Sequence, residues 1–110
     1  MCVLPYTQLV NKYKVLKTSE FEKWFSKQEK WVKALVTARL DLLTLGHLGD
    51  HKKFDGLIEL RWKRGIRIYS FMWGDSVVIA LNGGNKRGQQ RDINKAKKIR
   101  NEILEGTRTI

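Results

Sequence analysis

Apolar and polar residues alternate along the middle of the chain in three short runs between residues 57 and 81. A period of two is typical of strands with one buried face, and consecutive strands of this kind pair as antiparallel hairpins. The first hairpin is expected to turn at Lys63-Arg64-Gly65. Side chains on a strand point alternately to opposite faces, so the pattern predicts that Arg61, Arg67 and Tyr69 share one face of the sheet.

A period of three to four residues precedes the strands and predicts two helices. Apolar positions recur at helical spacing through residues 21–45, and the polar segment 26–30 interrupts them. Ser19 and the glutamate three positions later have the spacing of a capping box, which starts the first helix there. Gly46 can adopt the left-handed conformation that ends the second helix. We therefore expect a helical hairpin with one apolar side.

The segments around these elements complete the predicted order. Residues 12–15 alternate basic and apolar side chains, which indicates an edge strand, and residues 46–56 are expected to form a loop. Gly83-Gly84 is expected to form the turn into a last helix, with Asp92 as its cap and Gly106 at its end. The stripe that this helix turns toward the core consists of Ile93, Ala96, Ile99, Arg100, Ile103 and Leu104.

The order of elements is strand, helix, helix, three strands and helix. This order predicts an α+β fold with an antiparallel-rich sheet, an N-terminal helical hairpin and a C-terminal helix. The 110 residues fit a single domain spanning 1–110. Residues 1–10 are expected to be an N-terminal extension, because Pro5 blocks an early helix, and residues 107–110 are expected to be a tail.

Composition adds a strong charge asymmetry to this picture. The 22 Lys+Arg against 11 Asp+Glu give a net charge of +11, which favours anionic partners, nucleic acid above all. An anionic membrane or an acidic protein fits the charge alone equally well. The longest purely apolar run, Val77 to Leu81, is far too short to span a membrane, and the lone Cys2 indicates a reducing compartment. We expect a soluble cytoplasmic protein with no membrane partner.

Three cationic side chains are candidates for binding a phosphate: Arg61, Arg67 and Lys86. An isolated arginine on a strand is ordinarily a solvated surface group, but three cations converging beside a glycine turn favour a functional site. Guanidinium groups bind a phosphate through paired hydrogen bonds and stabilise the charge that gathers on it during transfer. The backbone amides near Gly83-Gly84 can also hold a phosphate, with a plain strand-to-helix connector as the alternative.

No metal or cofactor site is expected. His47 and His51 have the spacing of two metal ligands on a helix, but Gly49 lies between them and no third ligand is evident. Contact of these histidines with a partner or substrate is the better interpretation.

The chain resembles toxins of the RelE superfamily, in the HigB-like branch of addiction module killer proteins. The resemblance rests on the order and spacing of short motifs that together cover about two-thirds of the chain. These motifs are Phe21-x-x-Trp24, Ala38-Arg39-Leu40, Gly46-x-x-Gly49-Asp50-x-Lys52, Glu59-Leu60-Arg61, Gly65-x-Arg67-x-Tyr69, Gly83-Gly84-x-Lys86, Gln89 and Asp92-Ile93-x-x-Ala96.

The resemblance implies a RelE-like fold and an mRNA endoribonuclease, or mRNA interferase, that acts in the ribosomal A site. It also implies neutralisation by a cognate helix-turn-helix antitoxin. In such enzymes the 2′-hydroxyl of the RNA attacks the adjacent phosphate without a metal. Because these residues match functional positions of the family, the resemblance implies a role for each. Arg67 would stabilise the scissile phosphate, Arg61 would make a second phosphate contact, and Lys86 would protonate or stabilise the leaving oxygen. The implied catalytic residues are Arg61, Arg67, Lys86 and Asp92, and the implied substrate-binding residues are Lys52, Glu59, Tyr69 and Gln89.

The chain departs from the family pattern at several positions. The segment 63–66, Lys-Arg-Gly-Ile, replaces the usual Gly-Pro-Gly-Tyr, so an aromatic ring is missing at its last position, and Asn85 stands where an aspartate is common. Some relatives use a tyrosine near Asp92 as the general base, and this chain has none there. The general base therefore remains open among Asp92, Glu59 and Tyr69.

Two other functions remain open from the sequence. The first is a non-catalytic RNA-binding or ribosome-binding protein of the same fold, which would bind RNA in a salt-sensitive way without cutting it. The second is a basic protein whose charge serves only to bind an acidic partner, and such a protein would have no affinity for RNA.

Overall fold

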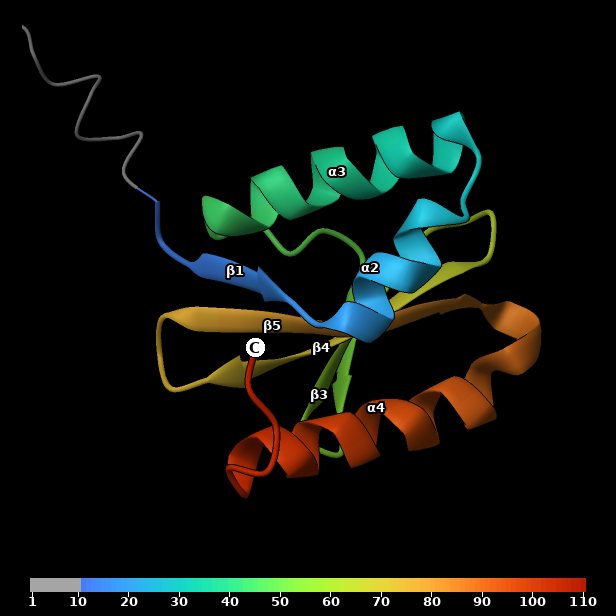
Figure 1. Cartoon of the computed structure of the whole chain (residues 1–110). Helices are drawn as coiled ribbons and strands as arrows, with labels where there is room; N and C mark the ends of the chain where they lie inside the picture. The colour runs from blue at the N-terminus through green and yellow to red at the C-terminus, as the bar shows by residue number, and fades with distance from the viewer. Residues whose placement is uncertain (1–10) are drawn as a thin grey trace, which may run out of the picture.

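A computed structural model describes residues 11–110. The predicted extension, with Pro5 and Cys2, lies outside the described residues. Figure 1 shows the elements, which follow one another as β1 (Lys14–Lys17), α2 (Ser19–Ser26), α3 (Lys30–Thr44), β2 (His51–Phe54), β3 (Leu57–Arg61), β4 (Ile66–Trp73), β5 (Val77–Asn85), the 3-10 helix η1 (Lys86–Gly88) and α4 (Gln89–Leu104).

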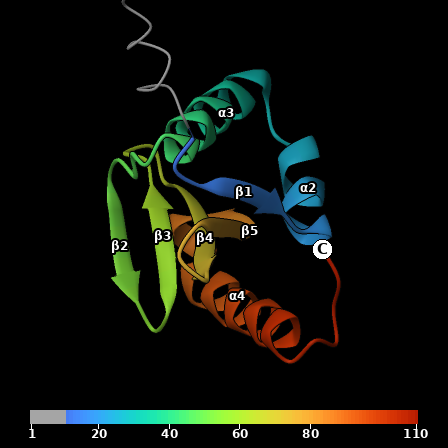
Figure 2. The ribbon, with the colours of Figure 1, turned by 90° about the vertical axis from the view of Figure 1, so that its left-hand side faces the viewer.

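The five strands form one mixed sheet in the order β1-β5-β4-β3-β2. Strands β2 to β5 pair antiparallel with their sequence neighbours, whereas β1 lies at the edge and runs parallel to β5. Helices α2 and α3 lie on one side of the sheet and α4 lies on the other (Figures 1 and 2). The predicted α+β class is therefore confirmed, with a sheet that is mostly antiparallel.

Each face of the sheet buries its own apolar cluster, as the alternation along the strands requires. The cluster under α2 and α3 contains Phe21, Val32, Val36, Leu40, Leu43, Ile58, Leu60, Ile66, Ile68, Val78 and Ala80. The cluster under α4 contains Leu57, Tyr69, Phe71, Ile79, Leu81, Ile93, Ala96, Ile99 and Ile103. In the predicted stripe of α4, Leu104 is an exception, because its side chain is exposed.

The two N-terminal helices begin and end close to where their periodicity predicts. Each packs on the sheet, α2 against β5 and α3 against β1, and their pairing as a helical hairpin is not confirmed. The cap of α2 is Thr18 and not Ser19. The Thr18 hydroxyl accepts a hydrogen bond from the Phe21 amide at 3.1 Å and donates one to the Leu81 carbonyl at 2.5 Å. The buried Thr18 hydroxyl is the better cap because it satisfies the first turn of the helix and also hydrogen-bonds to β5.

The loop predicted for residues 46–56 is wrong in its second half, which forms β2. β2 pairs antiparallel with β3 through a two-residue turn at Asp55 and Gly56. Both turn residues have positive φ, 50° and 75°, as a tight hairpin turn of this kind requires. Strand β2 was not predicted because its two central residues are both exposed lysines, so the segment shows no alternation of apolar and polar residues.

The glycine turn predicted at Gly83-Gly84 is also wrong, because both glycines lie inside β5. A Cβ on Gly83 would overlap the ring of Trp24, and a Cβ on Gly84 would overlap the carboxyl group of Asp92. The glycines are therefore required by helices α2 and α4 pressing on the two faces of β5. Helix α4 begins at Gln89, three residues before the predicted cap at Asp92, with Gly88 at its N-cap position.

The predicted tail after Gly106 is tied to the rest of the protein. The guanidinium of Arg108 pairs with Glu20 of α2 at 2.6 Å and with Glu102 of α4 at 2.8 Å. One side chain thus links helices that lie on opposite faces of the sheet.

Replacing Gly83 with alanine tests the close contact between α2 and β5. We expect Gly83→Ala to lower the free energy of unfolding by about 1–3 kcal/mol, because overpacking forces the Trp24 ring to move. Urea denaturation measures this loss. In a Trp24→Ala background the same substitution should cost much less, because the space is then free. An equal cost in both backgrounds would contradict the contact.

Within residues 11–110, no helix has the length and apolar character needed to cross a membrane.

Candidate functional site

Four polar side chains share the α4 side of the sheet, on the paired strands β3 and β4. In the register of these strands, Arg61 stands directly opposite Arg67, and Glu59 stands opposite Tyr69. The common face of Arg61, Arg67 and Tyr69 is the one that the alternation predicts. Like charges directly opposite one another destabilise a sheet, so an Arg-Arg pair needs a compensating reason for its presence.

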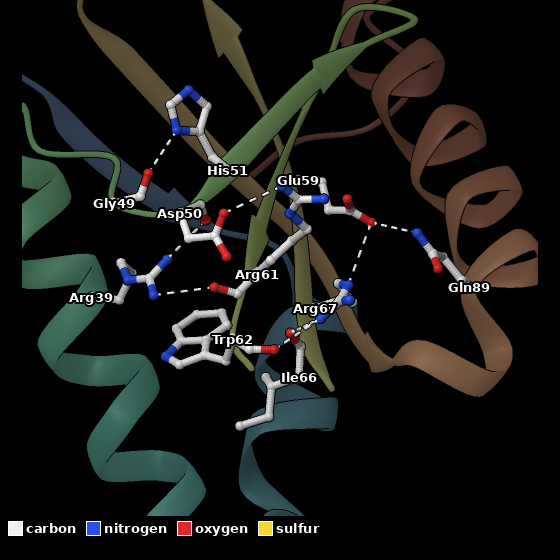
Figure 3. Close-up of polar contacts among 10 residues, drawn as sticks. All are labelled: Arg39, Gly49, Asp50, His51, Glu59, Arg61, Trp62, Ile66, Arg67 and Gln89. Atoms are coloured by element: carbon white, nitrogen blue, oxygen red, sulfur yellow. Dashed lines mark hydrogen bonds and ion pairs between the residues drawn. The ribbon is translucent and has the colours of Figure 1, made fainter. Parts of the chain in front are cut away.

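A buried carboxylate provides part of the compensation. The side chain of Glu59 is 1% exposed and lies 3.8 Å from Arg67 Nε. Gln89, at the start of α4, donates a hydrogen bond from Nε2 to Glu59 Oε2 at 2.8 Å. A buried charge is tolerated only with such partners, so Glu59 fixes both the Arg67 guanidinium and the first turn of α4 (Figure 3).

The Arg67 guanidinium is also held by the backbone. Its Nη1 donates to the carbonyls of Trp62 and Ile66 at 3.1 and 3.0 Å. Within residues 11–110, the Nε atoms of Arg61 and Arg67 are buried without a hydrogen bond. Buried donors without partners are rare, and two of them on register partners indicate that polar groups are arranged here for a purpose other than stability.

A second network from α3 holds Arg61. Asp50 Oδ1 accepts a hydrogen bond from Arg61 Nη2 at 3.3 Å. Arg39 donates to the carbonyls of Asp50 and Arg61, each at 3.2 Å, and its guanidinium lies 4.3 Å from the ring centre of Trp62 (Figure 3). Burial lowers the pKa of Arg39, and the nearby Asp50 carboxylate raises it in part. Arg39 and Asp50 both belong to motifs of the resemblance, but their roles were not predictable from the sequence.

Tyr69 lies beneath this surface. Its side chain is fully buried, and its hydroxyl has no hydrogen-bond partner among the described residues. Burial raises the pKa of Tyr69 well above its ordinary value, and the charges of Glu59 and Asp92 raise it further. The hydroxyl therefore stays protonated at neutral pH, and its burial keeps it from the solvent.

Lys52, Lys86 and Asp92 lie around these residues. Lys52 is exposed on β2 opposite Glu59 in the strand register. Asp92 stands in the first turn of α4 with its carboxyl group over Gly84, the residue that pairs with Arg67. Burial raises the pKa of Asp92, although the charges of Arg91 and Lys95 oppose the shift.

Lys86 is exposed in η1, beyond the last pair of β4 and β5. It lines an open hollow of about 650 Å³ between the β3–β4 turn and η1, which we call the terminal hollow. Arg61 and Arg67 do not line this hollow. The predicted convergence of all three cations is therefore not found there. The terminal hollow is lined by Lys63, Arg64, Gly65, Asn85, Lys86 and Arg87.

The two histidines lie on β2 and in the loop that precedes it. His51 lies on β2 with its Nδ1 at 2.8 Å from the Gly49 carbonyl, and His47 is exposed. Within the part of the chain that the structure describes, no three His, Cys, Asp or Glu side chains are grouped so as to hold a metal ion.

Comparisons with known proteins place the chain in a family. No protein-family model matches it. It is 38% identical over 90 residues to an uncharacterized protein of Haemophilus influenzae, which covers 78% of this chain and 91% of that protein. The chain belongs to the same family as that protein. The description of the Haemophilus influenzae protein states no activity, so membership of this family does not by itself indicate a function.

A solved structure supports the fold of this family member. A chain of the toxin-antitoxin complex RelBE2 from Mycobacterium tuberculosis is similar, with a TM-score of 0.57 and 18% sequence identity. The similarity covers 67% of this chain and 98% of that chain. It supports the predicted RelE-like fold.

The arrangement suits an anion that carries several oxygen atoms. Arg61 and Arg67 are register partners on β3 and β4, and each guanidinium group is paired with its own carboxylate, Asp50 for Arg61 and Glu59 for Arg67. Their side chains are 36% and 13% exposed, so Arg61 is partly accessible to solvent while Arg67 lies deeper. Oriented guanidinium groups in a partly buried site stabilise negative charge more strongly than mobile surface cations do.

Proposed function

We propose that this protein is the toxin of a type II toxin-antitoxin system, of the HigB-like branch, and that it cuts mRNA on the ribosome. The observation that carries the proposal is the pair of facing arginines, Arg61 and Arg67, each oriented by a carboxylate. The RelE-like fold and the net charge of +11 support it, because both fit a protein that acts on RNA.

The proposed reaction is an internal transfer within the RNA. The 2′-hydroxyl oxygen forms a bond to the adjacent phosphorus, and the bond from phosphorus to the 5′-oxygen of the next nucleotide breaks. A base accepts the proton of the 2′-hydroxyl, and an acid supplies a proton to the 5′-oxygen. The products are a 2′,3′-cyclic phosphate and a 5′-hydroxyl end, and no other reactant is consumed.

The cations take the roles that charge development demands. Negative charge grows on the phosphate oxygens in the transition state, and Arg67, the more deeply held guanidinium, is proposed to stabilise it. Arg61 makes a second contact to the same phosphate. Lys86 is proposed to protonate or stabilise the 5′-oxygen, and the exposed Lys52 to bind the RNA backbone.

Burial separates the candidates for the general base. Glu59 is paired with Arg67 and Gln89 beneath the surface, and Tyr69 is buried and protonated, so neither is suited to meet the 2′-hydroxyl. Asp92 is partly exposed, and its raised pKa makes it a stronger base than an ordinary aspartate. We therefore assign proton acceptance to Asp92 and give Glu59, Gln89 and Tyr69 the task of positioning.

This assignment predicts the pH dependence of cleavage. Asp92 accepts a proton only when it is ionised, so the rate should fall as the pH drops through its raised pKa. Asp92→Asn should lower the rate at neutral pH by roughly 10²–10⁴-fold and remove this acid limb. Asp75→Asn, a change of an exposed aspartate in the β4–β5 turn, is the matched control and should preserve both. Single-turnover cleavage from pH 4 to 8 measures the effect, and an unchanged limb in Asp92→Asn excludes this base.

An antitoxin is the proposed protein partner, and a small helix-turn-helix protein is the expected type. The similar RelBE2 structure is a toxin-antitoxin complex. This chain also presents apolar side chains to solvent along one side of α3 and at its C-cap, which is typical of a surface that another protein covers. These side chains are Trp31, Leu35, Leu42 and Leu45.

Controlled expression in bacteria tests the proposal. We expect growth arrest, and new transcript ends should appear within translated regions, with 5′-hydroxyl groups at the cut. In a purified translation system, cutting should require ribosomes. Salt-sensitive RNA binding without new ends would favour a non-catalytic RNA-binding protein, and absence of RNA affinity would favour a protein that binds only an acidic partner.

A further inference from the structure

The terminal hollow concentrates positive charge next to the candidate site. Four of its six walls are cationic: Lys63, Arg64, Lys86 and Arg87. Within residues 11–110, none of the four makes an ion pair with a carboxylate. No acidic residue lines the hollow, so its charge is not compensated by the protein. Repulsion among clustered cations costs stability, which makes a hollow of this kind a binding place for an anion.

Two of the walls are held in place by local contacts. The Arg64 guanidinium lies 4.9 Å from the ring centre of Trp31 on α3, a contact that restrains the side chain without neutralising it. The Asn85 side chain accepts a hydrogen bond from the Arg87 amide at 2.9 Å, which fixes the start of η1. The β3–β4 turn meets η1 at Gly65, where a Cβ would lie 3.8 Å from Lys86 Cβ. The hollow is therefore formed by ordered elements.

The hollow continues the candidate site along the sheet. Arg67 pairs with Gly84, and the next pair, Ile66 with Asn85, reaches the wall of the hollow. Successive residues of a strand are about 3.3 Å apart, so along the strand direction the hollow begins one residue beyond Arg67. Lys63, Arg64 and Asn85 are also positions where the chain departs from the pattern it resembles, and each departure makes the hollow more positive.

We propose that the terminal hollow binds the backbone phosphate adjacent to the one at Arg61 and Arg67, so that single-stranded RNA lies across both places. This inference rests on the proposed function for its substrate class. Lys63, Arg64 and Arg87 supply the charge, and Lys86 stands between the two phosphates. Such a subsite would determine the direction in which the bound RNA crosses the β-sheet.

RNA binding at several salt concentrations tests the subsite. The probe is a labelled single-stranded RNA of eight nucleotides with 2′-O-methyl groups, which cannot be cut because the attacking hydroxyl is blocked. Fluorescence anisotropy gives its affinity. The test variant is Lys63→Gln with Arg87→Gln. The control is Lys14→Gln with Lys98→Gln, which removes the same charge from exposed positions, one at the opposite end of the sheet and one along α4.

The slope of log affinity against log salt distinguishes a phosphate contact from general charge. Each lost contact to single-stranded RNA should reduce the slope by about 0.7, and we expect this in the test variant and not in the control. A dinucleotide with a single phosphate should bind both variants alike, because it occupies only the Arg61 and Arg67 pair. Equal slopes for test and control variants would overturn the subsite. So would a test variant that keeps its RNA slope but loses affinity for polyglutamate, since the hollow would then be a protein contact.

The subsite and the proposed function fail in different ways. Loss of slope in the test variant with no new transcript ends from the natural protein would leave the subsite standing and remove the nuclease. New transcript ends together with equal slopes would leave the nuclease and remove the subsite.

Discussion

Replacing Arg67 with alanine is expected to abolish growth arrest and to slow cleavage by roughly 10²–10³-fold or more. The guanidinium is oriented by Glu59 on one side and by two backbone carbonyls on the other. Its charge is thus placed before RNA arrives and needs no rearrangement as the phosphate gains charge. Transcript-end mapping and single-turnover cleavage measure the loss.

Two further variants separate a catalytic effect from a folding defect. Arg67→Gln keeps an amide donor for the Trp62 and Ile66 carbonyls but removes the charge, so it should stay folded and remain inactive. Arg67→Lys keeps the charge but lacks the planar fork, and it should not restore full activity. Circular dichroism and thermal unfolding verify the fold. Growth arrest and unchanged transcript ends in the alanine and glutamine variants would rule out this site.

Replacing Glu59 with alanine is expected to lower the free energy of unfolding by about 3–5 kcal/mol. The change leaves the partly buried Arg67 guanidinium without its carboxylate partner, and it removes the hydrogen-bond acceptor of Gln89. Glu59→Gln should cost less, because an amide oxygen can still accept from Gln89. Urea denaturation compares these variants with Glu105→Ala, an exposed control that should change stability by less than about 0.5 kcal/mol.

A Glu59→Ala protein as stable as the control would show that the carboxylate is not needed to hold the arginine. Activity gives a second measure of the same role. Because Glu59 acts through Arg67, the less disruptive Glu59→Gln variant should reduce the cleavage rate while leaving the acid limb of Asp92 in place. A role as general base would instead remove that limb.

The strands that carry the candidate site were predictable because their pattern is local. Alternation alone places Arg61 and Arg67 on one face, and the hairpin around residues 63–65 follows from the turn between two such runs. β2 was missed because its exposed lysines hide the apolar period. Asp55-Gly56, a dipeptide that favours tight hairpin turns, was the available signal.

The contacts between layers were not predictable in this way. Gly83 and Gly84 suggest a turn when only their neighbours in sequence are considered, yet Trp24 and Asp92 are the reason for them. The burial of Glu59 likewise depends on α4 covering the sheet. The motif that contains Arg39 marked this residue as important but did not identify its partners. These are backbone carbonyls of other elements, at Asp50 and Arg61.

The position of β5 in the sheet has a consequence for synthesis of the protein. β5 lies between β1 and β4, so a strand near the start of the chain completes its pairing only with one near the end. Such distant pairings form late. Arg108 then closes the fold from the last residues. The sheet therefore cannot be completed during synthesis until β5 has left the ribosome, and the N-terminal elements wait for it without their partner strand.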